Sequence, residues 1–248
     1  VALAAAALPV FAQQYPVRPV RAIIAFPPGS STDIIGRVIT QKVAEYWGQA
    51  IVADNRGGAG GSIGSATVAR AAPDGYTLLI NSNAHSVNPS FYAKLPYDTS
   101  RDFIDIGMLA IQPNVLMVNN NSSIKSTLDL IKQAKAKPNA INIAHAGIGS
   151  GTHLNSVKFK LVAGVEFTDV AYKGSGEVII DVMGGRVDGY FSPISAGMSF
   201  IQSGKVRAVA VSTTKRSSQL PNVPTIAESG LPGFDYYLWF GLWAPAGT

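Results

Sequence analysis

Short apolar runs alternate with longer amphipathic segments along most of the chain. Amphipathic segments predict helices at 33–47, 61–72, 125–136, 151–163, 174–184 and 195–203. Runs rich in Val, Ile, Ala or aromatic residues predict strands at 20–26, 50–54, 76–81, 114–118, 141–145, 167–172, 187–191 and 206–212. This alternation of strands and helices is typical of α/β folds with largely parallel sheets.

Glycine and hydroxyl residues gather where the predicted strands end, which is the edge at which α/β proteins bind ligands. Such loops lie at 26–33, 55–64, 81–90, 146–153 and 173–177. Each can offer backbone N–H groups and hydroxyls to an anion without a fixed counter-charge. Tight turns also need glycine for steric reasons, and we favour that interpretation for 55–64.

The FPPGSSTD segment at 26–33 has the features of an anion site at the start of a helix. Its two prolines end the preceding strand, Gly29 allows close approach of backbone, and Ser30, Ser31 or Thr32 can cap the helix. Asp33 falls in the first helical turn, where a carboxylate stabilises the helix dipole, and we prefer this role over general-base catalysis.

Composition and charge restrict the function further. The 248 residues are 47% apolar, which is enough for one large core or two modest ones. The formal charge of +5 is scattered, and only Lys132, Lys135 and Lys137 come close to a concentrated basic patch, as on a solvated helix face. We therefore expect a small anion as ligand, and no nucleic acid.

Motifs for catalysis, nucleotides and metals are missing from the sequence. The glycine clusters contain no GxGxxG, and the chain has no P-loop or HExxH motif, so no cofactor and no catalytic residue is predicted. His85, His145 and His153 lack metal-ligand spacing, and no metal site is predicted. We place His145 in the core, whereas His85 and His153 can donate to a carboxylate. Asp188 is either a paired structural residue or a site residue facing the cleft.

Residues 1–12 form an apolar, alanine-rich stretch that is similar to the end of a secretory signal cut near Ala12. The alternative is a buried N-terminal helix. Export would place the protein in the periplasm of a Gram-negative cell.

Eleven sequence blocks carry a resemblance to one family. They are FPPGSSTD (26–33), NRGGAGGSIG (55–64), APDGYTLL (72–79), NPSFYAKLPYD (88–98), RDF (101–103), GIGSGTHL (147–154), YKGSGE (172–177), DVMGGRVDGYF (181–191), GKVRAVAVSTTKRS (204–217), LPNVPTIAESGLPGF (220–234) and WFGLWAPAGT (239–248). In this order they resemble the Bug, or TctC-like, periplasmic solute receptors of tripartite tricarboxylate transporters, over essentially the whole chain after residue 15.

The resemblance implies an α/β, two-domain periplasmic-binding-protein (type II) fold with parallel-rich sheets and a cleft between the domains. We expect a signal-peptide remnant at 1–14, a first domain of 15–118 plus 232–248, and a second domain of 119–231. Hinged crossings are expected near 117–122 and 228–233. Family members continue beyond residue 248, so the C-terminal part of the first domain is expected to be missing from this chain.

The resemblance also implies which residues bind the ligand. One domain would contribute Pro28, Gly29, Ser30, Ser31, Thr32, Asp33, Ser82, Asn83 and His85. The other would contribute Gly147, Ser150, Gly151, Thr152, His153, Tyr172, Lys173, Gly174 and Asp188, with the adjoining residues of 147–153 and 172–175. Phe26, Tyr172 and Phe191 could line an aromatic slot, although core packing is the preferred role of Phe26 and Phe191.

These features favour a monomeric, non-catalytic receptor that captures a small carboxylate by hinged closure and delivers it to the membrane components of a transporter. The carboxylate would be a di- or tricarboxylate or an aromatic acid. Two alternatives stay open, an α/β enzyme acting on a carboxylic acid through His85, His153 or Asp188, and an extracytoplasmic ligand sensor.

Overall fold

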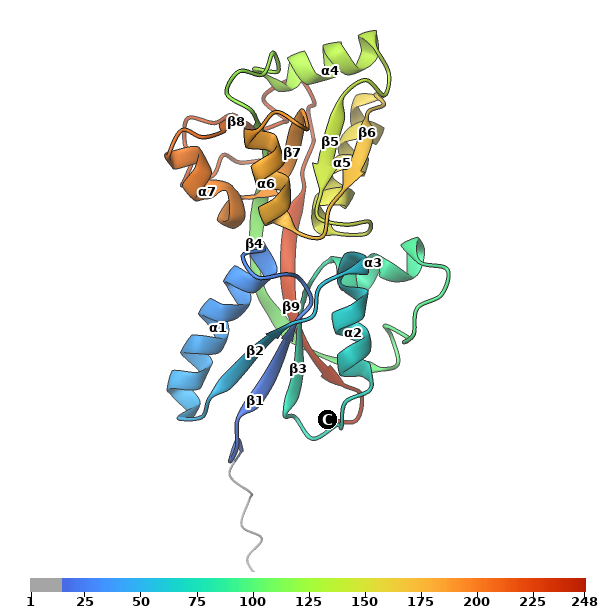
Figure 1. Cartoon of the computed structure of the whole chain (residues 1–248), viewed down its shortest axis with the longest axis vertical. Helices are drawn as coiled ribbons and strands as arrows, with labels where there is room; N and C mark the ends of the chain where they lie inside the picture. The colour runs from blue at the N-terminus through green and yellow to red at the C-terminus, as the bar shows by residue number, and fades with distance from the viewer. Residues whose placement is uncertain (1–14) are drawn as a thin grey trace, which may run out of the picture.

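The computed structural model describes residues 15–248, which form two lobes joined by a pair of long strands (Figure 1). The predicted signal remnant at 1–14 lies outside the described residues. No helix within 15–248 is both long and apolar enough to cross a membrane.

The lower lobe in Figure 1 is built on a five-stranded sheet in the order β2-β1-β3-β9-β4. Its strands are β1 (Val20–Ile24), β2 (Ile51–Asn55), β3 (Thr77–Ser82), β9 (Tyr237–Pro245) and the first part of β4 (Phe103–Val118). Its helices are α1 (Ser31–Trp47), α2 (Ser62–Ala69) and α3 (Ala84–Phe91), with a short 3-10 turn at Ala59–Gly61. β1 pairs in parallel with β2 and β3, whereas β9 runs antiparallel to β3 and β4.

The upper lobe contains the end of β4 and four further strands. They are β5 (Asn142–His145), β6 (Thr168–Ala171), β7 (Gly189–Pro193) and β8 (Arg207–Val211). The helices are α4 (Thr127–Ala136), α5 (Gly151–Ala163), α6 (Ser175–Met183) and α7 (Ile194–Gln202). One apolar cluster packs α4 and α5 on one side of this sheet, and another packs α6 and α7 on the other side. Both faces of the sheet are therefore covered, as parallel strands require.

The two lobes share strand β4, which changes partners in its middle. β4 pairs with β9 as far as Pro113, and from Asn114 onward it pairs with β7 and β8. Proline lacks the N–H group of a regular ladder, which suits a position where pairing changes. The change of sheet thus comes before the predicted crossing at 117–122, and β9 begins after the one at 228–233. The domain boundaries at 118/119 and 231/232 stay a prediction.

The α/β class is confirmed, but three elements differ from expectation. The first half of β4 was not predicted, because Asp105 and Gly107 interrupt its apolar pattern and several of its side chains are exposed. β9 was not assigned although it is rich in aromatic residues. α3 was missed because Pro89 lies inside it. The two long strands pair antiparallel to their neighbours, so the sheets are less parallel than predicted.

Candidate functional site

A small cavity lies between the lobes, at the carboxyl ends of the strands. Its volume is about 20 Å³, which corresponds to room for roughly one water molecule. It is lined by Phe26, Ser30, Ser31, Thr32, Ser82, Ala146, Ser150, Gly151, Thr152, Ser175, Pro193 and Leu238. The described conformation is therefore closed, and the predicted loops after β1, β3, β5 and β6 meet in one place.

The lower wall begins with the loop that connects β1 to α1. Ser30 caps α1 by accepting a hydrogen bond from the Asp33 N–H at 3.3 Å, and Ser31 and Thr32 follow as buried residues of the first turn. This arrangement presents hydroxyls and the positive end of the helix dipole to the cavity. Ser82 adds a further hydroxyl from the end of β3.

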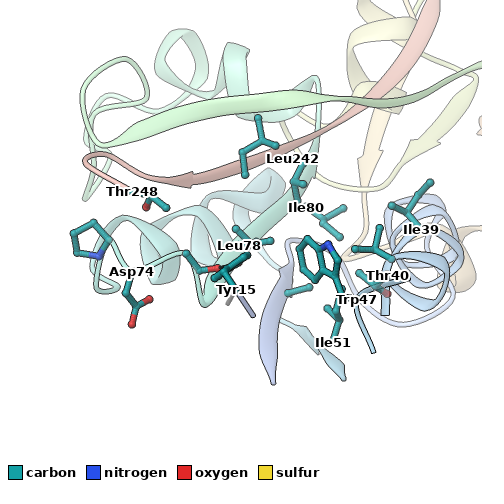
Figure 2. Close-up of a pocket in the computed structure, with 15 residues that line it drawn as sticks. Tyr15, Ile39, Thr40, Trp47, Ile51, Asp74, Leu78, Ile80, Leu242 and Thr248 are labelled. Carbon is teal, nitrogen blue, oxygen red and sulfur yellow. Dashed lines mark hydrogen bonds between the residues drawn. The ribbon is translucent and has the colours of Figure 1, made fainter. Parts of the chain in front are cut away.

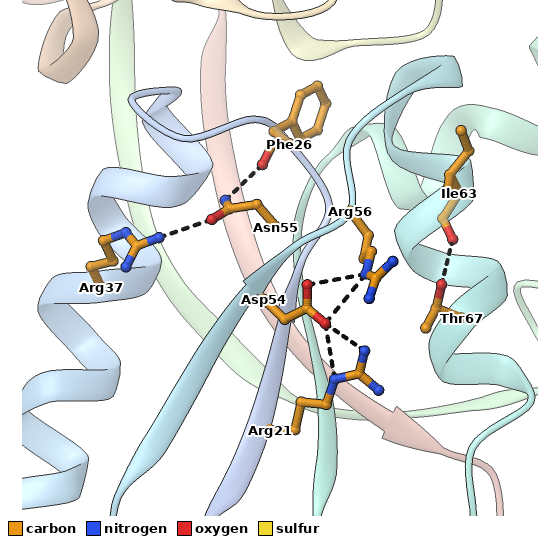
Figure 3. A network of polar contacts seen from close by, with 8 residues as sticks. All are labelled: Arg21, Phe26, Arg37, Asp54, Asn55, Arg56, Ile63 and Thr67. Carbon is orange, nitrogen blue, oxygen red and sulfur yellow. Dashed lines mark hydrogen bonds and ion pairs between the residues drawn. The ribbon is translucent and has the colours of Figure 1, made fainter.

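Asp33 holds this loop in place and does not line the cavity. Its carboxylate accepts hydrogen bonds from the Gly29 N–H at 2.9 Å, from Arg37 Nε at 2.8 Å and from Asn55 Nδ2 at 2.8 Å. Asn55 also donates to the Phe26 carbonyl at 2.9 Å (Figure 3). The helix-start role of Asp33 is therefore observed. Gly29 is exposed and does not line the cavity either.

The upper wall repeats the same construction at the start of α5. Ser150 caps the helix by accepting from the His153 N–H at 3.3 Å, and its hydroxyl lies 3.0 Å from Thr152 Oγ1. Thr152 Oγ1 also accepts from the Ala146 N–H at 2.9 Å. Ser175 completes the wall at the start of α6, where its hydroxyl accepts from Tyr190 at 2.8 Å.

The cavity wall contains no charged side chain among residues 15–248. Its polar groups are hydroxyls and backbone N–H groups at three helix starts. Neutral donors and helix dipoles of this kind can bind a carboxylate without an ion pair.

His85 lies away from the cavity, contrary to its predicted role as a ligand donor. Its ring is buried beside Tyr97, Phe103 and Trp243, and Nδ1 lies 3.0 Å from the Ser65 hydroxyl. Burial lowers the pKa of His85 to about 4. The His85 ring therefore lies in the core of the lower lobe, and it is neutral at neutral pH.

Asp188 is a second correction, because it stands at the amino end of β7, whereas the cavity lies at the carboxyl end. Its carboxylate is exposed and accepts a hydrogen bond from the Asn142 N–H at 2.7 Å. The structure therefore selects the structural role over the cleft role.

The remaining upper-lobe candidates surround the site without lining it. His153 packs against His145 with ring centres 4.4 Å apart, and burial lowers its pKa. The Tyr172 hydroxyl donates to Asp181, and burial together with this carboxylate raises the pKa of Tyr172 to about 12. Lys173 is exposed. Gly147 and Gly174 lie at the contact between the lobes, facing residues of the lower lobe.

Three lining residues were not among the predicted ligand contacts, namely Pro193, Leu238 and Ala146. Pro193 ends β7, so the rule that ligands bind at carboxyl ends of strands could have found it. Leu238 was missed because β9 was not predicted. Pro28, in contrast, is exposed and does not line the cavity.

A separate hollow of about 550 Å³ lies on the lower lobe, between α1 and the sheet (Figure 2). Its walls are mainly apolar and include Trp47, Leu78, Ile80 and Leu242, with Thr248 at one edge. Residues 15–248 contain no group of three or more His, Cys, Asp or Glu side chains that could hold a metal ion.

Comparisons with known proteins agree with this architecture. The family model described as "Tripartite tricarboxylate transporter family receptor" (TctC) matches residues 35–248. Protein BugT of Bordetella pertussis is 39% identical over 250 residues, covering 100% of this chain and 77% of BugT.

Two solved structures are similar throughout both lobes. An R. palustris protein solved with adipate has a TM-score of 0.91 and 36% identity, covering 94% of this chain and 79% of its own. MatC from Rhodopseudomonas palustris, solved with bound malate, has a TM-score of 0.88 and 33% identity, covering 94% and 80%. The chain therefore belongs to the TctC family of tripartite tricarboxylate transporter receptors.

Proposed function

We propose that this protein is a periplasmic receptor that captures a small dicarboxylate between its lobes. The observation that carries the proposal is the meeting of three helix starts, from α1, α5 and α6, at one cavity lined by hydroxyls. Two opposed helix starts suit a ligand with two anionic ends. The similar structures solved with adipate and with malate support a dicarboxylate as ligand.

Binding requires the lobes to move. A cavity of about 20 Å³ is smaller than any dicarboxylate, so the ligand enters while the lobes are apart and the cleft closes around it. Closure moves the upper lobe against the lower lobe. The switch of β4 between sheets at Pro113 supports a hinge close to that residue.

A short aliphatic acid suits the walls better than an aromatic acid. Phe26 is the one aromatic residue among those lining the cavity, and Phe191 lies fully buried in the core of the upper lobe. Leu238 and Pro193 provide apolar contact for a methylene chain. The closed receptor, acting as a monomer, then presents its ligand to the membrane components of a tripartite transporter.

Isothermal titration and thermal unfolding test this proposal. Malate and adipate are compared with citrate, benzoate and the neutral diamide of adipate. We expect a dicarboxylate to stabilise the fold by about 2.7 kcal/mol at one hundred times its Kd, and the diamide to have no effect. Binding of neutral sugars or cations, with no response to any carboxylate, would overturn the proposal. Chromatography of the bound acid tests the enzyme alternative, because a receptor returns its ligand unchanged.

A further inference from the structure

Hydrogen bonds join the two lobes outside the cavity wall, and one of them involves Tyr92. Tyr92 directly follows α3 of the lower lobe, and its hydroxyl donates to the carbonyl of Ile148 in the upper lobe at 2.9 Å. Ile148 lies in the loop between β5 and α5. Separation of the lobes must break this bond, because its partners belong to different lobes.

Tyr236 makes a second connection, just before β9. Its hydroxyl donates to the Gly151 carbonyl at 2.7 Å and accepts from Asn83 Nδ2 at 2.8 Å. The Tyr236 hydroxyl has one proton, which it donates to Gly151. Asn83 must therefore be the donor in the other hydrogen bond, through its Nδ2. A loop of the lower lobe is thereby linked to the start of α5 in the upper lobe. Burial raises the pKa of Tyr236, so the hydroxyl stays a donor.

Glycines allow the lobes to approach closely around these tyrosines. A Cβ at Gly60 would overlap the Ile148 carbonyl and stand 3.2 Å from the Tyr92 hydroxyl. A Cβ at Gly149 would stand 2.9 Å from Asn88 Oδ1.

The contact between the lobes also contains groups that oppose closure. Asn83 Oδ1 and Asn88 Oδ1 are buried and accept no hydrogen bond within residues 15–248. An amide oxygen loses its hydration when it is buried without a partner, which disfavours the closed form. The closed form thus gains a few hydrogen bonds between the lobes and leaves a few buried amide oxygens without a partner. These opposing contributions leave the closed and open forms close in free energy.

We propose that the hydroxyls of Tyr92 and Tyr236 form a latch that sets the fraction of receptor that is closed, and thereby the affinity, without contact to the ligand. The latch rests on the proposed closure of the lobes. Neither tyrosine lines the cavity. Loss of one neutral hydrogen bond corresponds to about a twofold to tenfold change in the ratio of closed to open receptor.

Spin labels test the latch without any ligand. The chain contains no cysteine, so Gln41→Cys on α1 and Lys135→Cys on α4, both exposed, give one label in each lobe. We expect Tyr92→Phe to shift the distance distribution measured by electron spin resonance toward longer distances. Tyr15→Phe is the matched control, because its hydroxyl donates to the Gly75 carbonyl at 2.6 Å within the lower lobe.

Tyr236→Phe provides a second variant, and it should also open the lobes, because Asn83 of the lower lobe then loses its hydrogen bond to the upper lobe. Thermal unfolding verifies that both variants are folded. Distances identical to those of the parent chain in both variants would overturn the latch. If the distances lengthen but malate and adipate never shorten them, the latch stands and the proposed function fails. If the dicarboxylates close every variant with equal Kd, the latch has no role in affinity and is refuted.

Discussion

The close approach of the lobes at Gly151 gives a sharp test of the closed form. Gly151 is the first residue of α5, and a Cβ there would stand 2.6 Å from Asn83 Oδ1 and closer still to Leu238 Cδ1. Both neighbours are buried, and the Asn83 amide is held by Tyr236. The substitution Gly151→Ala therefore overpacks the closed form at a cost of about 1–3 kcal/mol.

We expect this cost to appear in ligand binding. The Kd for a dicarboxylate should rise by roughly 5-fold to 150-fold, because the bound form is the closed form. The open form has no such overlap, and alanine is a better helix former than glycine by up to about 1 kcal/mol. The free energy of unfolding of the ligand-free protein should therefore change by less than about 1 kcal/mol. Titration calorimetry and urea unfolding measure the two quantities.

Gly176→Ala is the matched control. Gly176 lies in the first turn of α6 in the same lobe, and a Cβ there meets no atom within 4 Å. It should leave the Kd unchanged. If the Kd values of Gly151→Ala and Gly176→Ala both equal that of the parent chain, the lobes do not close as described, and the reasoning is refuted.

Three further predictions concern the walls and the titrating residues. The double substitution Ser31→Ala and Thr32→Ala should weaken dicarboxylate binding by about 1–3 kcal/mol, and unchanged affinity in calorimetry would leave these residues only a structural role. Asp188→Asn should leave affinity unchanged, because its carboxylate is far from the cavity; a measured loss would return it to the site. Burial lowers the pKa of both His85 and His145 from 6.5 to about 4. The unfolded chain then binds more protons between these values, so stability is complete above pH 6.5 and falls as the pH decreases, by about 2 kcal/mol per histidine at pH 5. Urea unfolding at pH 7.5 and pH 5 measures this loss, and equal stability at both would contradict it.

The site was predictable where chemistry follows from local sequence. The runs around Ser31 and Ser150 combine a strand end, glycine and hydroxyls, and these features alone define a helix start that can hold an anion. Both segments line the cavity. The prediction that these segments converge rested on the general rule that ligands bind at the carboxyl ends of strands.

The predicted site residues that lie away from the cavity are placed there by contacts distant in sequence. The position of His85 is decided by Trp243, which lies on a strand that the sequence pattern did not reveal. Asp188 was assigned to the interior of a strand, but β7 begins one residue later, and this places the carboxylate at the opposite end of the sheet. The latch at Tyr236 is likewise invisible in the sequence, because its partners are 153 and 85 residues away.

The paired strands β4 and β9 also determine how the lobes can move. Two hydrogen-bonded strands resist stretching and sliding, since either motion breaks several ladder bonds, whereas they yield more easily to twist and bend. The lobes therefore approach each other by twisting and bending of β4 and β9, unlike two domains that are joined by a flexible linker. The entropy lost in orienting the two lobes is therefore lost mostly during folding and not during closure. More of the free energy of the ligand contacts then appears as binding affinity.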